Sequence, residues 1–105
     1  MRSELEEEQT LEQAYQKLRA YTALDHRIRI RAIFLIADNP GIGFNELVKR
    51  TKVPTGKLAY HLALLGSGDL VSMKHERKGK VTSHYYVTDL GERMVRELRS
   101  EVRKQ

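Results

Sequence analysis

The amino-acid sequence predicts a mainly α-helical domain with one small antiparallel β-hairpin, an α+β arrangement. Over most of the chain, apolar residues recur at spacings of three and four, the period of an amphipathic helix. From Leu70 onward the period changes to two on both sides of a Gly-containing loop, which is the pattern of two paired strands. With 105 residues and no linker-like stretch, the chain (1–105) is expected to form a single domain.

The absence of cysteine limits the possible chemistry. It excludes disulfide frameworks, thiolate zinc sites and cysteine nucleophiles. No apolar run approaches the ~20 residues that a membrane span needs, and the acidic N-terminus does not resemble a signal peptide. We therefore expect a cytoplasmic protein without a membrane partner.

The charge is unevenly distributed along the chain. The formal net charge is +5, but the segment 1–25 is acidic, whereas the segment 26–88 contains eleven basic and four acidic residues. Such a segregated positive field favours a polyanionic partner, either nucleic acid or an anionic membrane surface. A basic surface that only confers solubility is the alternative, and charge alone does not decide between them.

Two helices are expected before residue 40. The first covers roughly 4–22, and its apolar stripe is Leu11, Ala14, Tyr15, Leu18 and Thr22. The second covers 25–37, with Asp25 as its N-cap and the stretch 39–41, Asn-Pro-Gly, as its stop. Because this second helix is apolar on two sides, we expect it to pack on two sides, between the core and a dimer interface.

The remaining elements complete the order ααααββα. A helix at about 44–51 is followed by a turn at 52–54 and by a second helix at about 55–66, whose inward residues are Leu58, Leu62 and Leu65. Strands are predicted at 70–75 and 81–88, joined by the loop 76–80. Thr88 or Asp89 then caps a last helix that extends to about 103.

Two short helices separated by a turn and followed by a basic hairpin are the parts of a winged helix-turn-helix. The major groove of duplex DNA, about 12 Å wide, admits one helix, and a hairpin beside it reaches neighbouring phosphates or the minor groove. A helix that enters the groove needs an outward face without acids. No carboxylate occurs from Pro54 to Ser67, so the second helix meets this requirement.

Residues 24–91 resemble the winged-helix domain of ArsR-like regulators, close to the archaeal versions. The resemblance rests on three stretches: ALDHRIRIRAIFLIADNPGIGFNELVKRTKV (23–53), LAYHLALLGSGDLV (58–71) and YYVTDLG (85–91). It implies a homodimeric, DNA-binding transcription regulator that dimerises through its terminal helices. The usual small-residue-plus-Gly turn is here Gly68-Asp69, which we expect to be tolerated because Asp adopts the left-handed conformation. The chain has no cysteines and its last helix has no histidine, so metal sensing does not carry over.

The candidate DNA-binding residues lie on the helix 55–66 and on the hairpin. On the helix they are Thr55, Gly56, Lys57, Tyr60 and His61, and on the hairpin Arg77, Lys78, Gly79 and Lys80. Lys57 and Tyr60 are expected to face the groove. Thr55 either caps its helix or contacts phosphate, and His61 either donates to phosphate or packs as a structural histidine.

The terminal helices are expected to form a dimer interface because their apolar stripes lack a core to pack against. The residues of this interface are Leu11, Tyr15, Leu18, Leu90, Met94, Leu98 and Val102. The chain would then comprise an N-terminal dimerisation helix (1–23), a DNA-binding core (24–88) and a C-terminal helix (89–105). Three arginines, Arg27, Arg29 and Arg31, either contact phosphate or pair with the acidic first helix of a partner.

The histidines and tyrosines of the hairpin have structural alternatives to binding a metal or a base. His75 and His84 are placed to face each other across it, but two histidines without a third ligand do not make a metal site, so neither a metal nor a cofactor is expected. Tyr85 and Tyr86 point to opposite faces of their strand, so at most one can stack on a base while the other packs inside.

We therefore expect a non-catalytic, homodimeric regulator of the nucleoid that binds double-stranded DNA. Phosphate-binding loops, zinc-binding HExxH pairs and catalytic triads are absent from the sequence, which argues against an enzyme. The alternatives are a winged-helix module for protein contacts in a transcription or chromatin assembly, and an RNA-binding winged helix. The operator, the regulated genes, the direction of regulation and any effector ligand are not specified by the sequence.

Overall fold

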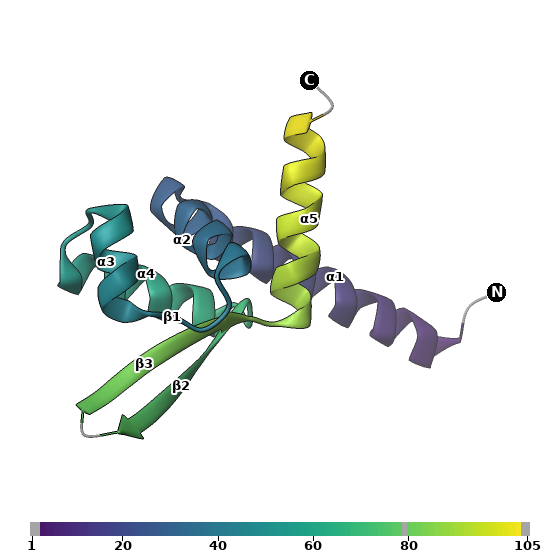
Figure 1. Cartoon of the computed structure of the whole chain (residues 1–105). Helices are drawn as coiled ribbons and strands as arrows, with labels where there is room; N and C mark the ends of the chain where they lie inside the picture. The colour runs from purple at the N-terminus through teal and green to yellow at the C-terminus, as the bar shows by residue number, and fades with distance from the viewer. Residues whose placement is uncertain (1–2, 79, 104–105) are drawn as a thin grey trace.

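The computed structural model describes residues 3–78 and 80–103, with the side chains at 77, 78, 80, 81 and 103 left out. Its elements follow one another in the order α1 (Glu4–Leu24), α2 (Arg27–Asp38), β1 (Ile42–Gly43), α3 (Phe44–Thr51), α4 (Thr55–Ser67), β2 (Val71–Lys78), β3 (Lys80–Val87) and α5 (Asp89–Arg103) (Figure 1). The mainly helical fold with an antiparallel hairpin is thereby confirmed. The two-residue strand β1 was not predicted.

The sheet has three antiparallel strands in the order β1-β3-β2. β1 pairs with the inner part of β3, where Ile42 lies opposite Tyr85. β2 and β3 pair continuously from Val71 opposite Val87 to Lys78 opposite Lys80. The predicted loop at 76–80 was therefore wrong, because the ladder of paired residues continues through most of it.

Helix α2 lies at the centre of the core and contacts all four other helices and β3. Ala32, Ile33 and Ile36 on this helix have no exposed surface. The expected packing on two sides is present, since elements of the same chain lie against both sides. Ile30, Phe34 and Ala37 stay partly exposed, and a dimer contact on α2 stays a prediction. The largest fully buried side chains of the domain are Ile33, Ile36, Leu47, Leu58, Leu65, Leu70 and Met94.

The start of α2 differs from the prediction by one residue. The N-cap is His26, whose Nδ1 accepts the backbone N–H of Ile28 at 3.0 Å, and not Asp25, which ends α1. Imidazole nitrogen thus takes the place of the carboxylate oxygen that a capping aspartate would supply. The predicted stop is confirmed, because α2 ends at Asp38 and Gly41 adopts a φ of +86° that suits glycine.

The start of α5 is fixed to the junction between α4 and β2. Thr88 is the capping residue, as predicted: its Oγ1 accepts the N–H of Gly91 at 2.9 Å and donates to the carbonyl of Asp69 at 2.7 Å. The backbone N–H of Thr88 donates to the carbonyl of Leu70 at 3.0 Å. Gly91 passes so close to Leu70 that a Cβ at this position would overlap its carbonyl oxygen. Asp69 has a φ of +61°, which confirms the predicted left-handed turn.

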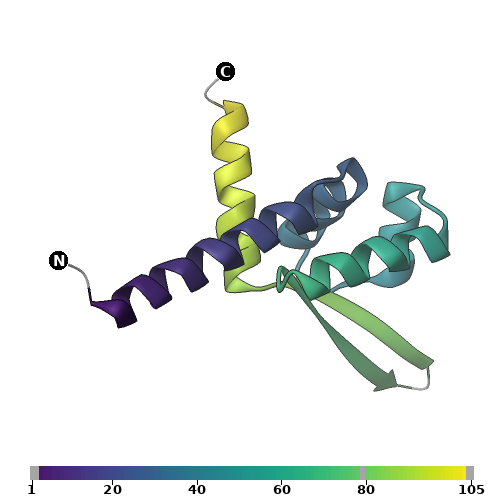
Figure 2. The ribbon, with the colours of Figure 1, turned by 180° about the vertical axis from the view of Figure 1, so that it is seen from behind.

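Helix α1 projects from the rest of the domain. Its N-terminal half extends to one side, past the base of α5 (Figures 1 and 2), and all residues from 3 to 19 are exposed. Only Ala20 and Leu24 are buried. Near its C-terminal end α1 touches α4, since a Cβ on Gly68 would lie only 2.5 Å from the Cβ of Ala23.

Within the described residues, no helix combines the length and the apolar character that crossing a membrane requires.

Candidate nucleic-acid interface

The helix-turn-helix consists of α3, a turn at 52–54, and α4. Lys52 turns the chain in the left-handed conformation, with a φ of +58°, and its N–H donates to the carbonyl of Val48 at 2.8 Å. Arg31 from α2 donates to the carbonyls of Arg50 at 2.7 Å and Thr51 at 3.2 Å. A cation at the C-terminal end of a helix is favoured by the helix dipole, so Arg31 fixes the end of α3 that leads into the turn.

Helix α4 has one buried and one exposed face. Leu58, His61, Leu62 and Leu65 are buried against the core. The exposed face, which we call the recognition face, consists of Thr55, Gly56, Lys57, Tyr60 and Ala63. Tyr60 is 61% exposed, and a Cβ on Gly56 would meet no atom within 4 Å. The recognition face is therefore open, lacks carboxylates and has one positive charge, on Lys57.

Thr55 is the first residue of α4 and is exposed. The N-cap is Pro54, and no side chain caps the helix by a hydrogen bond. The capping role predicted for Thr55 was therefore wrong, and its hydroxyl is left facing solvent at the N-terminal end of the helix.

His61 lies inside the protein, 3% exposed. Its Nδ1 is 3.0 Å from the NH1 of Arg29, and its ring lies 4.3 Å from that of His26, centroid to centroid. Burial, followed by the nearby charges of His26, Arg29 and Lys57, lowers the pKa of His61 below its usual value. The predicted DNA contact by His61 is contradicted, because its ring packs within the protomer, the structural alternative.

The β2–β3 hairpin, which we call the wing, extends from the sheet beside α4. The far ends of β2 and β3 and the N-terminal end of α4 project to the same side of the molecule, away from the projecting half of α1 (Figure 2). Gly79 lies outside the described residues, as do the side chains at 77, 78 and 80. The DNA contacts predicted for Arg77, Lys78, Gly79 and Lys80 therefore stay predictions, supported by the direction in which the two strands extend. Tyr85 is buried while Lys74 lies over the ring of Tyr86 at 5.2 Å, as expected for neighbours on opposite faces.

The wing histidines do not face each other as predicted. Ser83 lies opposite His75, and Lys74 lies opposite His84. The ring of His75 bonds to Ser83 at 3.3 Å, whereas Nδ1 of His84 donates to the carbonyl of Gly41 at 2.8 Å. In the part of the chain that the structure describes, no three potential metal-binding side chains gather.

Two of the three arginines on α2 bind backbone carbonyls of their own chain. Arg29 donates through Nε to the carbonyl of Ala23 at 2.6 Å and through NH2 to that of Asp25 at 3.2 Å. Arg31 binds the end of α3 in the same way. These bonds within the chain were not predicted. Contacts with phosphate or with a partner's acidic helix stay predictions for the three arginines, of which Arg27 and Arg31 are exposed. The sequence predicts that Arg29 and Arg31 lie on opposite edges of the helix. It does not predict which helix ends these two side chains contact.

The apolar stripe of α1 is uncovered in the protomer. Leu11, Tyr15 and Leu18 are each more than 60% exposed, and Val102 of α5 is 70% exposed. Met94 is different, at 2% exposed, because α5 packs this residue into its own core, so its predicted place in a dimer interface is contradicted. Leu90 and Leu98 are partly buried against that core.

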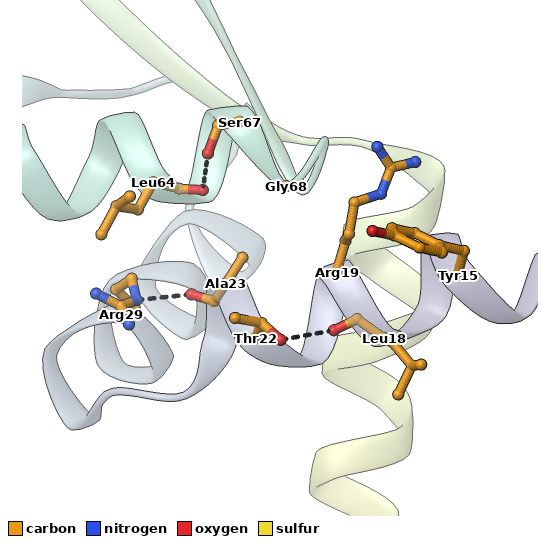
Figure 3. Close-up of a pocket in the computed structure, with 9 residues that line it drawn as sticks. All are labelled: Tyr15, Leu18, Arg19, Thr22, Ala23, Arg29, Leu64, Ser67 and Gly68. Atoms are coloured by element: carbon orange, nitrogen blue, oxygen red, sulfur yellow. Dashed lines mark hydrogen bonds between the residues drawn. The ribbon is translucent and has the colours of Figure 1, made fainter.

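A groove of about 570 Å³ runs between α1 and the C-terminal end of α4. Figure 3 shows Tyr15 and Leu18 on the α1 side, Leu64 and Ser67 on the α4 side, and Arg29 bonded to the carbonyl of Ala23. Two arginines and no carboxylates line this groove. The groove marks where α1 meets α4.

The three-stranded sheet, the α3-turn-α4 unit with its open outer face, and the paired β2–β3 extension define a winged helix-turn-helix domain. The family described as "HTH_HVO_0163_N, N-terminal HTH domain" matches residues 24–98, and the chain belongs to this family. A search among curated proteins found no relative.

Several solved structures share the fold. HlyU from Vibrio cholerae N16961 is 22% identical, with 89% of this chain and 97% of that one covered and a TM-score of 0.74. A transcriptional regulator homologue from Pyrococcus horikoshii OT3 is 17% identical, with 79% and 83% covered and a TM-score of 0.72. An uncharacterized SlyA-like transcription regulator from Listeria monocytogenes is 18% identical, with 99% and 71% covered and a TM-score of 0.68. At these identities the likeness establishes the fold.

Proposed function

We propose that this protein is a non-catalytic transcription regulator that binds double-stranded DNA as a homodimer. The observation that carries the proposal is the recognition face, which is exposed, free of acids and beside the wing. The small residues Gly56 and Ala63 allow the helix backbone to approach base edges closely. Lys57 and Tyr60 supply the donors, to guanine acceptors or to phosphate.

The wing supplies the larger part of the affinity in this proposal. Its sequence from Arg77 to Lys80 contains three cations around Gly79. The far ends of β2 and β3, which flank Gly79, lie on the same side as the start of α4 (Figure 2). Phosphate contacts provide most of the affinity of such proteins and make it dependent on salt. If a dimer neutralises about eight phosphates, the logarithm of the binding constant falls with the logarithm of salt concentration at a slope near −7.

The homodimer is proposed from the uncovered stripe of α1. Three large side chains, Leu11, Tyr15 and Leu18, are exposed in a row, and Val102 adds to the apolar surface on α5. A two-fold related copy would cover this surface and present two copies of α4 to half-sites about 34 Å apart on a pseudo-palindrome. The protein would act in the cytoplasm, on the nucleoid. The resemblance to ArsR-like regulators supports the same assembly.

Selection of bound sites from a random duplex library tests the proposal directly. We expect enrichment of a pseudo-palindrome whose half-sites are one helical turn apart. Mobility shifts on the selected site then compare Lys57→Gln with Arg96→Gln, a variant of equal charge loss on the exposed surface of α5. Lys57→Gln should weaken specific binding by about 1–3 kcal/mol, whereas Arg96→Gln should not change it beyond the small effect of net charge.

The wing is tested by the double variant Arg77→Ala plus Lys80→Ala. Loss of two phosphate contacts in each protomer, four in the dimer, should make the salt slope shallower by about 3.6 and weaken binding to all duplex sequences alike. Binding that is unchanged in this variant would remove the wing from the interface. Stronger binding to structured RNA than to duplex DNA at equal salt would replace the proposal by an RNA-binding function.

A further inference from the structure

Three elements meet at a cluster formed by Arg29, His61 and His26. Arg29, on α2, bonds to the carbonyls of Ala23 and Asp25 at the end of α1, and its NH1 lies 3.0 Å from the Nδ1 of His61 on α4. His26, at the start of α2, lies with its ring 4.3 Å from that of His61. One guanidinium therefore connects the end of the projecting helix α1 to the recognition helix.

The hydrogen bonds of the cluster fix the protonation of both histidines. A guanidinium only donates, so Nδ1 of His61 must accept and carries no proton. Nδ1 of His26 also accepts, from the backbone N–H of Ile28 at 3.0 Å. Imidazolium has no acceptor nitrogen. A second proton on His61 therefore breaks its bond to Arg29, and one on His26 breaks the cap of α2.

The surroundings of His61 disfavour that proton. From α2 it faces Arg29 and His26, and from its own helix Lys57 and the ring of Tyr60, which lies edge-on at 5.4 Å. The acidic side chain at the end of α1, Asp25, is exposed. Strand β2 also packs against α4, and its titratable residues Lys74, His75 and Glu76 are exposed as well. A proton on His61 would place a buried cation beside Arg29, and the charges that act on its ring are all positive.

The link matters because its two ends carry the two halves of the proposed function. Helix α1 presents the stripe proposed for dimerisation, and α4 presents the recognition face. Apart from this link, α1 touches α4 where Ala23 packs against Gly68, beside the groove in Figure 3. The angle between the two helices sets the distance between the two recognition faces of a dimer, and hence which half-site spacing fits.

We propose that Arg29 and His61 are positioning residues that hold the recognition helix at a fixed angle to α1, and that acidification breaks their bond and weakens DNA binding. The inference rests on the proposed function for its effect on DNA. Release of Arg29 from His61 weakens DNA binding as the pH falls.

The first test measures affinity for the selected duplex at about pH 7.5 and about pH 4.5. The lower pH lies well below the ordinary histidine pKa of ~6.5, because burial and the neighbouring positive charges lower the pKa of His61. We expect the native protein to bind about tenfold more weakly at the lower pH, a typical size for coupling between two sites. The matched variant is His61→Asn, whose amide oxygen takes the place of Nδ1 and accepts from Arg29 at either pH. Its affinity should stay level or rise on acidification. Equal pH profiles for the two proteins would overturn the inference while leaving DNA binding intact.

The second test needs no DNA. The chain has no cysteine, so spin labels can be placed at Glu12→Cys on α1 and Ala63→Cys on α4, both of which are exposed positions. The label pair reports the distance between these two helices. Unlabelled protein is added so that only pairs within one chain contribute. The distance distribution should change between the two pH values in the native background and stay constant with His61→Asn. An unchanged distribution in the native background would refute the link as a switch, even if the protein bound no DNA.

A second variant covers the case in which His61→Asn does not fold. His26→Asn keeps a good N-cap for α2 and removes the positive charge that would form beside His61. Its circular dichroism melt shows whether it is folded. Because the charge of His26 lowers the pKa of His61, the inter-helix distance of this variant should change at a higher pH than that of the native protein. A distance that changes at the same pH as in the native protein, or not at all, would contradict the switch.

Discussion

Replacing Gly91 by alanine would place a methyl group against the backbone of Leu70, where the start of α5 passes the junction between α4 and β2. The added Cβ would lie 3.1 Å from the carbonyl carbon and 3.4 Å from the Cα of Leu70, and it would overlap the carbonyl oxygen. These are backbone atoms, so no side-chain rotation relieves the overlap. The first turn of α5 would have to move away from Leu70.

The magnitude follows from the bonds that this movement breaks. Thr88 joins the two segments through its N–H to the carbonyl of Leu70 and through its Oγ1 to that of Asp69. Each is worth about 1 kcal/mol, and residual crowding costs about 1–3 kcal/mol. Alanine returns at most about 1 kcal/mol through its helix propensity. The net loss is about 2–4 kcal/mol, a large share of the 5–15 kcal/mol typical of a domain.

Urea unfolding followed by circular dichroism measures this loss, at one fixed protein concentration because association shifts the midpoint. Gly66→Ala is the matched control. Gly66 lies in α4, and a Cβ there would meet no atom within 4 Å, so the control should gain about 0.5–1 kcal/mol. If Gly91→Ala were as stable as Gly66→Ala, the close approach of α5 to Leu70 would be refuted.

Four further variants have defined outcomes. Lys52→Gly relieves a left-handed turn and should raise the free energy of unfolding by up to about 1 kcal/mol in the same urea assay. Arg31→Gln releases the end of α3 and should lower it by about 1–3 kcal/mol. The pKa of Asp38 is lowered by its bond to Arg99. This pair therefore stabilises the fold at pH values above the ordinary aspartate pKa, and the stabilisation is lost as the pH falls through the lowered pKa. In Asp38→Asn, the free energy of unfolding should decrease less on acidification than in the native protein. Leu18→Glu should shift the protein from dimer to monomer in sedimentation at micromolar concentration, and an unchanged dimer would exclude the α1 stripe as the interface.

Features set by local sequence were predictable. The helices α1 to α5 follow from three- and four-residue spacing of apolar residues, and the stop of α2 and the capping Thr88 follow from residues with fixed local roles. The left-handed Asp69 belongs with them, because it depends on the conformation of one residue. The open, acid-free face of α4 followed as well, since it is the complement of the buried stripe on the same helix.

Features set by tertiary pairing were not predictable. Strand β1 has two residues, too few for a period, and it exists because its backbone pairs with β3, some forty residues later. The charged segment 76–80 has the composition of a loop, but the ladder to the facing strand keeps most of it extended. His61 lies at the flank of an apolar stripe and Met94 lies within one. Only the neighbouring elements decide whether such a position is buried within the protomer.

Helix α1 also has a mechanical consequence. At about 1.5 Å per residue, its exposed portion forms an arm of roughly 25 Å beyond the point where Ala23 meets Gly68. A rigid rod pivoting at that point multiplies small rotations, so a tilt of only a few degrees carries its free end about 2 Å. Rotations of α1 that are too small to disturb the core would therefore displace the N-terminal end of this helix most.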